Sequence, residues 1–216
     1  MGQPTESVEL IFHHFPDLTP DQQDRFRILF DVYSVWNSKI NVISRKDIEH
    51  FYVRHVLHSL LIARYISFRD GTKIMDLGTG GGFPGIPLAI LFPQCRFHLI
   101  DSIGKKLTVV QAVAEAIGIN NIKTFHARAE DSPYTYDFVV SRAVAPFTDL
   151  AQWTKGKYNG KSLHDVPNGL ICLKGLQIED PKPRGSTLRS VPLKTYSDDP
   201  FFEEKALYHV SFPKGH

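Results

Sequence analysis

A glycine-rich loop between an apolar strand and a helix constrains this chain more than any other feature of its sequence. The loop covers residues 76–85 and contains five glycines. Residues 73–77, which include Ile74, Met75 and Leu77, indicate a short buried strand, and residues 86–91 indicate the start of a helix. Glycine lets the backbone turn sharply and lets a ligand approach the main chain closely. A strand, a glycine loop and a helix in this order predict a nucleotide-binding βαβ unit.

Strands and helices alternate through the rest of the chain. Apolar runs predict further strands at 96–100, 122–126, 138–140 and 170–173, and a helix at 105–117 that Gly118 closes. Residues 205–212 predict an antiparallel strand at an edge of the sheet, while 156–167 and 180–192 indicate irregular loops. Such alternation is typical of an α/β fold. We expect a Rossmann-like, mainly parallel seven-stranded sheet flanked by helices.

The first 70 residues predict helices only. A short apolar stripe lies at 8–15, and Thr19 offers an N-cap with Pro20 at the first helical position. Apolar side chains then recur at helical spacing over 26–36, and a third helix is predicted over 47–65. We therefore divide the chain into an N-terminal helical extension, residues 1–70, and a core, residues 71–216.

Composition narrows the protein class without identifying a ligand. The net charge of +2 permits a nucleic-acid partner but does not demand one. Two cysteines, far apart, argue against a disulfide scaffold and a cysteine-based zinc site, and no metal is predicted. No apolar run reaches the roughly 18 residues of a membrane span, and no signal peptide is evident. A cytoplasmic protein without a membrane partner is expected.

Two ligand chemistries use a loop of this kind. Gly80, Gly82 and Gly85 match the dinucleotide pattern G-x-G-x-x-G. The adenosylmethionine pattern D-x-G-x-G-x-G fits the whole loop better, through Asp76, Gly78, Gly80 and Gly82. A carboxylate there would oppose a pyrophosphate, but it suits a sulfonium and an α-amino group. We predict that these four residues bind S-adenosylmethionine. The alternative for Asp76 is a side-chain cap on the following turn.

Acidic residues also follow the next two strands. Asp101 ends the second strand, where an acid accepts hydrogen bonds from ribose hydroxyls, whether the ligand is a dinucleotide or S-adenosylmethionine. Asp101 is equally suited to cap a helix starting near Ser102, and the two roles are compatible. Ala129 and Glu130 follow the third strand, where adenine usually lies in such a fold. The alternative for Glu130 is an exposed loop acid.

From about residue 36 to Glu179 the motifs resemble one family, the small-subunit ribosomal RNA guanine-N7 methyltransferases of the glucose-inhibited division protein B family. The loop alone would indicate only the superfamily of adenosylmethionine-dependent methyltransferases. Its extension Phe83-Pro84-Gly85 is more specific, together with the segments 37–41, 54–59, 101–106, 128–130, 141–143 and 173–175.

The resemblance implies an enzyme that methylates N7 of one guanine in the decoding-region loop of 16S ribosomal RNA. It implies a cytoplasmic enzyme whose partner is this RNA, naked or within the small ribosomal subunit. We expect the protein to be a monomer. The resemblance places contacts to the cofactor S-adenosylmethionine at Gly78, Phe83, Ala129, Glu130 and Arg142. His58 departs from the family, which often has Asp there, and the tail after Gly175 matches poorly.

The residues are compatible with transfer to N7. Guanine N7 carries an exposed lone pair, so its site needs positioning more than a strong base. Methylation of an exocyclic amine typically uses an Asn/Asp-Pro-Pro-aromatic motif, which residues 141–147 lack. Methylation of a pyrimidine carbon needs a cysteine nucleophile, whereas Cys172 lies in an apolar run. Oxygen targets remain open.

Basic side chains are the candidate RNA contacts. Arg142 follows the fourth strand and is expected to position the cofactor or a phosphate, the alternative being an ion pair with Glu130 or Asp149. Arg54, His55, His58 and Ser59 share one side of a helix and suggest a polar lid or an RNA-facing patch. The residues assigned to RNA are Arg54, His55, Lys105, Lys106 and Lys174. Ordinary solvated surface residues are the alternative.

Two other function classes remain open from the residues alone. A nicotinamide-dependent oxidoreductase would use the same glycine loop, but it would have to explain Asp76 and lacks a Ser-Tyr-Lys set. A non-catalytic RNA-binding protein retaining the fold is the other alternative.

Overall fold

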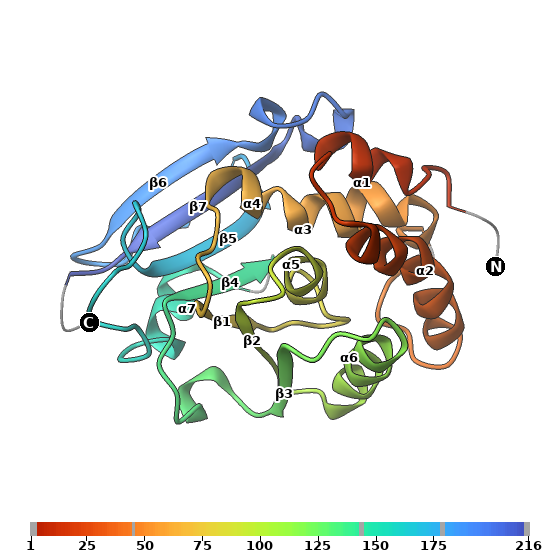
Figure 1. The fold of residues 1–216 in the computed structure, drawn as a ribbon. Coiled ribbons are helices and arrows are strands. Elements are labelled where there is room, and N and C mark those ends of the chain that lie inside the picture. The colour runs from red at the N-terminus through yellow and green to blue at the C-terminus, as the bar shows by residue number, and fades with distance from the viewer. Residues whose placement is uncertain (1–3, 45, 143–144, 178–179, 214–216) are drawn as a thin grey trace.

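The computed structural model describes residues 4–44, 46–142, 145–177 and 180–213. Ala143, Val144 and Glu179, which belong to segments named above, lie outside these ranges. The centre of the molecule is one seven-stranded sheet in the order β3-β2-β1-β4-β5-β7-β6 (Figure 1). Its strands are β1 Lys73–Leu77, β2 Arg96–Asp101, β3 Ile122–His126, β4 Phe138–Arg142, β5 Gly169–Gly175, β6 Thr187–Pro192 and β7 Lys205–Ser211. The predicted mainly parallel seven-stranded sheet is confirmed.

The first five strands are parallel, and β7 runs antiparallel to both β5 and β6. The prediction of an edge strand at 205–212 was therefore right in direction and wrong in position, because β7 is internal. The edge strand beside β7 is β6, within the segment 180–192 that the sequence indicated as irregular. Most of its side chains are exposed or half-exposed, so β6 lacks the apolar alternation that marks a strand.

Helices cover both faces of the sheet. The helices α5 Gly85–Leu91 and α6 Gly104–Ala116 bury their apolar sides with Phe97 and Leu99 of β2. On the other face, α7 Phe147–Trp153 packs with Met75 and Ile100 (Figure 1). Gly118 has a φ of 67°, as expected of the residue that ends α6.

The N-terminal helices pack on the same face as α5 and α6. They are α1 Glu9–His14 and α2 Pro20–Asn37, and α2 contacts both α5 and α6. Thr19 caps α2 as predicted and forms a capping box with Gln22. Residues 1–70 and the core therefore share one continuous hydrophobic cluster.

The helix predicted over 47–65 is broken into short pieces. A 3-10 turn at Ile48–His50 is followed by a π-helical turn at Tyr52–Leu57 and by the α-helical pieces α3 His58–Leu60 and α4 Ile62–Tyr65. No helix among the described residues is both long and apolar enough to cross a membrane.

Candidate functional site

The glycine loop is a sequence of tight turns directly after β1. Gly78, Gly80 and Gly82 have φ values of 68°, 58° and 99°, which favour glycine. A Cβ on Gly82 would lie 2.7 Å from Cγ1 of Ile86 and 3.0 Å from the Tyr33 hydroxyl. That hydroxyl donates a 2.6 Å hydrogen bond to the Gly81 carbonyl, so the N-terminal extension holds the loop directly.

Asp76 lies beneath the loop. One carboxylate oxygen, Oδ2, accepts hydrogen bonds from the Thr79 hydroxyl at 2.6 Å and from the Gly85 amide at 2.8 Å. The other oxygen, Oδ1, is buried and has no partner among the described residues. Burial raises the pKa of Asp76 to about 7. These contacts are those of the turn-capping alternative, and direct contact between Asp76 and a cofactor stays a prediction.

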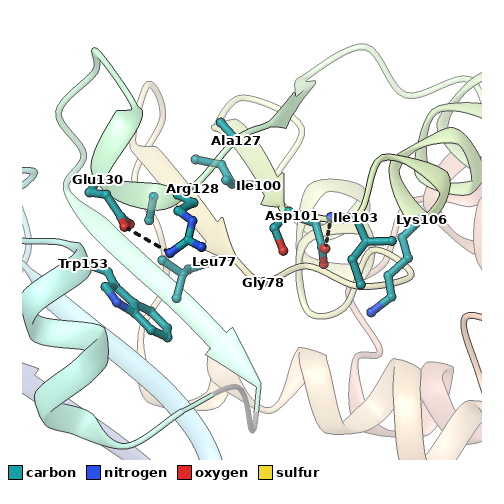
Figure 2. A pocket seen from close by; sticks show the side chains of 12 residues that line it. Leu77, Gly78, Ile100, Asp101, Ile103, Lys106, Ala127, Arg128, Glu130 and Trp153 are labelled. Carbon is teal, nitrogen blue, oxygen red and sulfur yellow. Dashed lines mark hydrogen bonds and ion pairs between the residues drawn. The ribbon is translucent and has the colours of Figure 1, made fainter.

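A cleft opens above the carboxyl ends of β1 and β2, where ligands bind in open α/β sheets. We call it the loop cleft. Its volume is about 410 Å³. Four predicted cofactor residues line it, namely Gly78, Asp101, Ala129 and Glu130 (Figure 2). The other lining residues are Leu77, Ile100, Ser102, Ile103, Lys106, Ala127, Arg128 and Trp153.

Asp101 links the loop to the start of α6. Its Oδ2 accepts from the Gly80 amide at 2.9 Å, and its Oδ1 accepts from the Ile103 amide at 2.8 Å. Each carboxylate oxygen can accept more than one hydrogen bond. The two predicted roles of Asp101, capping a turn and binding hydroxyls, therefore remain compatible in the structure.

The far wall of the loop cleft combines charge with an aromatic ring. Arg128 and Glu130 approach to 4.0 Å and are both exposed, while the Trp153 indole extends from α7 toward the cleft (Figure 2). Trp153 was missed because α7 was not predicted. Ile103 was also missed. Its position two residues after Asp101 was visible in the sequence, but only the structure shows that this apolar side chain is 48% exposed.

Arg142 does not line the loop cleft. Its guanidinium lies over the Phe83 ring, 5.1 Å from the centroid, and donates to the Arg54 carbonyl at 3.1 Å and to His55 Nδ1 at 3.0 Å. Burial lowers its pKa to about 10, so it stays charged at neutral pH. Within the described chain it forms no ion pair with Glu130 or Asp149, the alternative raised from the sequence. Phe83 is 3% exposed and packs against the rings of Tyr33 and His55.

The polar patch predicted on one side of the helix is not at the surface. His55, His58 and Ser59 are 8%, 6% and 0% exposed, because α1 packs on the π-helical turn, α3 packs on α5, and Arg142 contacts His55. Burial and the neighbouring Arg142 lower the pKa of His55 to about 3, so a neutral ring accepts from Arg142. Only Arg54 is partly exposed, and it pairs with Asp47 at 2.8 Å.

The predicted RNA-binding lysines differ in their availability. Lys105 is exposed in the first turn of α6, and Lys106 lines the loop cleft. Lys174 is paired with Asp180 at 2.5 Å, and its side chain is only 11% exposed. In this conformation Lys174 is therefore not free to contact a phosphate.

Comparison with known proteins identifies the family. Residues 22–178 match the family model described as rRNA small subunit methyltransferase G. The ribosomal RNA small subunit methyltransferase G of Bacteroides thetaiotaomicron is 54% identical over 205 residues, which cover 94% of this chain and 98% of that protein. The protein of the same name from Christiangramia forsetii is 46% identical, with 94% and 97% covered.

Solved structures show the same fold at low sequence identity. A variant of MtNAS in complex with S-adenosylmethionine aligns with a TM-score of 0.61 at 12% identity, over 95% of this chain and 83% of that one. A SAM-dependent methyltransferase from Aquifex aeolicus aligns with a TM-score of 0.55 at 12% identity, over 78% and 98%. The fold is that of the Rossmann-like methyltransferases, and the chain belongs to the rRNA small subunit methyltransferase G family.

Proposed function

We propose that this protein transfers a methyl group from S-adenosylmethionine to N7 of a guanine in the decoding-region loop of 16S ribosomal RNA. The observation that carries the proposal is the loop cleft, which combines the glycine loop, Asp101 and the segment 127–130 in a chain of this family. We further propose that the enzyme is a cytoplasmic monomer and acts on the RNA free or within the small ribosomal subunit.

The residues of the loop cleft fit S-adenosylmethionine. Asp101 offers carboxylate oxygens to ribose hydroxyls, and Gly78 leaves room for the cofactor to approach the main chain. Ile103 and Trp153 offer apolar surface to an adenine ring between Ala129 and the start of α6. When bound, the cofactor supplies an electrophilic methyl group on a sulfonium.

The side chains around the cleft suit an acceptor that needs no deprotonation. Both cysteines are buried, and burial raises the pKa of Cys172 to about 12, so a thiolate nucleophile is not available. His55 is neutral, but its Nδ1 accepts from Arg142. Guanine N7 attacks through its own lone pair, so the protein has to supply orientation and field rather than a strong base.

Arg142 is proposed as a positioning residue rather than a general base. Its guanidinium contacts both the Phe83 ring of the loop and the Arg54 carbonyl, and these two contacts connect the glycine loop to the π-helical turn. Asp76, Gly80, Gly82 and Phe83 act in the same way, by holding the shape of the loop. Arg54, Lys105 and Lys106 are the proposed phosphate contacts, and of these Lys106 lines the loop cleft.

The test is methyl transfer from labelled S-adenosylmethionine to small-subunit RNA and to small subunits from cells that lack this protein. N7-methylguanine is then mapped by chemical cleavage at the modified base. One modified guanine in the decoding region is expected. Calorimetry with S-adenosylhomocysteine and NAD provides the control. Binding of NAD without binding of S-adenosylhomocysteine would instead favour the oxidoreductase, and binding without transfer would favour a non-catalytic RNA-binding protein.

A further inference from the structure

A second hollow lies at the amino ends of the strands, whereas the loop cleft lies at their carboxyl ends. Its volume is about 560 Å³, and it is lined by the first residues of three adjacent strands, Lys73 of β1, Arg96 of β2 and Ile122 of β3. The loop cleft lies at the other end of β1 and β2. Since a strand rises about 3.3 Å per residue, roughly 15 Å separates the two sites. We call the second hollow the basic pocket.

The strand register gathers cations on one face of the basic pocket. Lys73 lies opposite Arg96, and Lys123 lies opposite His98. Paired residues on neighbouring strands project to the same face, and so do residues two apart on one strand. Arg96 and His98 are two apart, so all four side chains share a face. Three of these four, Lys73, Arg96 and Lys123, are cationic and exposed.

Among the described residues, these charges are not paired with acidic side chains. No acidic side chain lines the basic pocket, and within the described ranges none of the three cations forms an ion pair. The carboxylate of Asp137 accepts from the Lys73 main-chain amide at 2.9 Å and from Asn159 at 2.7 Å. Like charges directly opposite on neighbouring strands destabilise a sheet. A bound anion would relieve this repulsion.

An exposed aromatic ring completes the wall. Tyr134 is 44% exposed, and its ring meets the edge of His98 at 4.9 Å. His98 is hydrogen-bonded through Nδ1 to the Tyr136 hydroxyl at 3.0 Å. Burial and the two neighbouring lysines lower the pKa of His98 to about 4, so at neutral pH it supports Tyr134 as a neutral ring. Cations beside an exposed aromatic ring are the combination that holds single-stranded nucleic acid.

We propose that the basic pocket binds a single-stranded segment of RNA, with Lys73, Arg96 and Lys123 on phosphates and Tyr134 stacked on a base. Inorganic phosphate or an acidic peptide would use the cations but leave the exposed ring without a matching partner. The proposal rests on the proposed function only in taking this RNA to be part of the substrate. Binding at the basic pocket would hold that RNA at a second point, in addition to the loop cleft.

The first test uses a labelled oligouridylate, which contains no guanine and so offers no N7 to the methyl-transfer site. Binding is followed by fluorescence anisotropy for the full chain and for Lys73→Gln/Lys123→Gln. The matched control, Lys182→Gln/Lys194→Gln, removes two exposed lysines from the β6 side of the sheet. The pocket variant is expected to bind roughly tenfold more weakly, and the slope of log affinity against log salt should fall by about 1.4 for two phosphates. The control should change far less.

The second test concerns the ring. Tyr134→Leu keeps apolar bulk and removes the stacking surface, so a loss of roughly tenfold is expected. Tyr134→Phe should retain wild-type affinity. If Tyr134 had a purely structural role, Tyr134→Leu would lower the melting temperature of the free protein, and the two variants would not differ in RNA affinity. The lysine variant should melt at or above the wild-type temperature, because it removes a repulsion.

Three results would overturn the proposal: no binding of oligouridylate by the wild-type protein, equal losses in the pocket and control variants, or stronger binding of polyglutamate than of oligouridylate. Failure of the proposed function is a different result. It would be a wild-type protein that binds oligouridylate but neither binds S-adenosylhomocysteine nor methylates small-subunit RNA.

Discussion

Single residues hold the glycine loop from two sides. Asp76 binds the Gly85 amide from below, and Asp101 binds the Gly80 amide from the neighbouring strand. Both carboxylates therefore act on the main chain of the loop, and only Asp101 also lines the loop cleft. A substitution at this scale can change the shape of the loop without touching a ligand.

Gly78 tests the position of the proposed cofactor site. Its φ of 68° is matched by Gly118, with 67°, which lies at the end of α6 with open space around it. An alanine in this conformation costs about 1–2 kcal/mol. We expect both Gly78→Ala and Gly118→Ala to lower the free energy of unfolding by this amount, and only Gly78→Ala to weaken binding of S-adenosylhomocysteine. Calorimetry on the folded variants measures this difference. Equal affinities in the two variants would place the cofactor elsewhere.

Arg142 tests positioning against stability. Lysine keeps the charge but cannot donate to both the Arg54 carbonyl and His55 Nδ1 from one planar group. Arg142→Lys is expected to lose more than about tenfold in methyl transfer and to lose about 1–3 kcal/mol of stability from the unsatisfied partners. Activity and melting are measured on the same preparations. Full activity well below the melting temperature would mean that Arg142 serves stability alone.

Asp76 predicts a pH dependence of stability. Its pKa in the folded protein is about 7, whereas an unfolded aspartate titrates at about 3.9. Between these values the folded state holds a proton that the unfolded chain releases, so stability falls as the pH rises from about 4 to 7 and is constant above. Asp76→Asn should remove this pH-dependent part of the free energy of unfolding, which is measured by urea unfolding between about pH 4 and pH 7. A difference between wild type and variant that does not vary with pH would contradict the raised pKa.

At the scale of elements, α2 is tied to the core near its first residues and again at Tyr33. Gln22 completes the capping box and also donates from Nε2 to the Ile90 and Leu91 carbonyls at 2.9 and 3.0 Å. These are carbonyls of the last turn of α5, which the helix itself leaves unpaired. Further along α2, Tyr33 reaches the Gly81 carbonyl. The extension is therefore attached to the helix that follows the glycine loop and to the loop itself.

Gln22→Ala should accordingly destabilise more than an ordinary helix substitution. The loss of one cap on α2 and of the donor to two α5 carbonyls predicts about 1–3 kcal/mol. The matched control is Gln23→Ala, since within the described part of the chain the Gln23 side chain bonds only to its own segment, to the Leu18 carbonyl and Arg27. Urea unfolding of the two variants gives the comparison. Equal destabilisation would show that the link between α2 and α5 contributes nothing measurable.

At the scale of the whole molecule, the proposed ligand surfaces lie at the two ends of the same strands. The loop cleft follows the carboxyl ends of β1 and β2, and the basic pocket lies at their amino ends. The net charge is only +2, so the attraction for RNA depends on where the cations gather rather than on their total.

This distribution predicts different salt responses for the two ligands. For oligouridylate held at the basic pocket, three phosphate contacts at about 0.7 each in the logarithmic slope predict a loss of roughly twentyfold in affinity between about 50 and 200 mM salt. S-adenosylhomocysteine, held in the loop cleft by hydrogen bonds and apolar contacts, should change far less. Anisotropy and calorimetry over one salt series provide the comparison. A flat response for RNA would mean that stacking and base contacts dominate recognition.

The sequence by itself determined the features that depend on neighbouring residues. Apolar runs of period two or near 3.6, the cap at Thr19 and the loop glycines predicted β1 to β5, α2, α5 and α6, because each signal acts within a few residues of chain. Asp101, predicted as a ligand-binding residue from its place at the end of a strand, lines the loop cleft, since the carboxyl ends of parallel strands meet on one side of the sheet.

Only the tertiary structure decided the features that depend on distant segments. The edge strand β6 is held by its ladder with β7 and has little pattern of its own, and α7 becomes recognisable only where Phe147 and Leu150 meet the sheet. Arg142 and His55 lie 87 positions apart, and the fold buries them together. The basic pocket likewise requires the register that places Lys73 beside Arg96, which is set by packing across the whole sheet rather than by either strand alone.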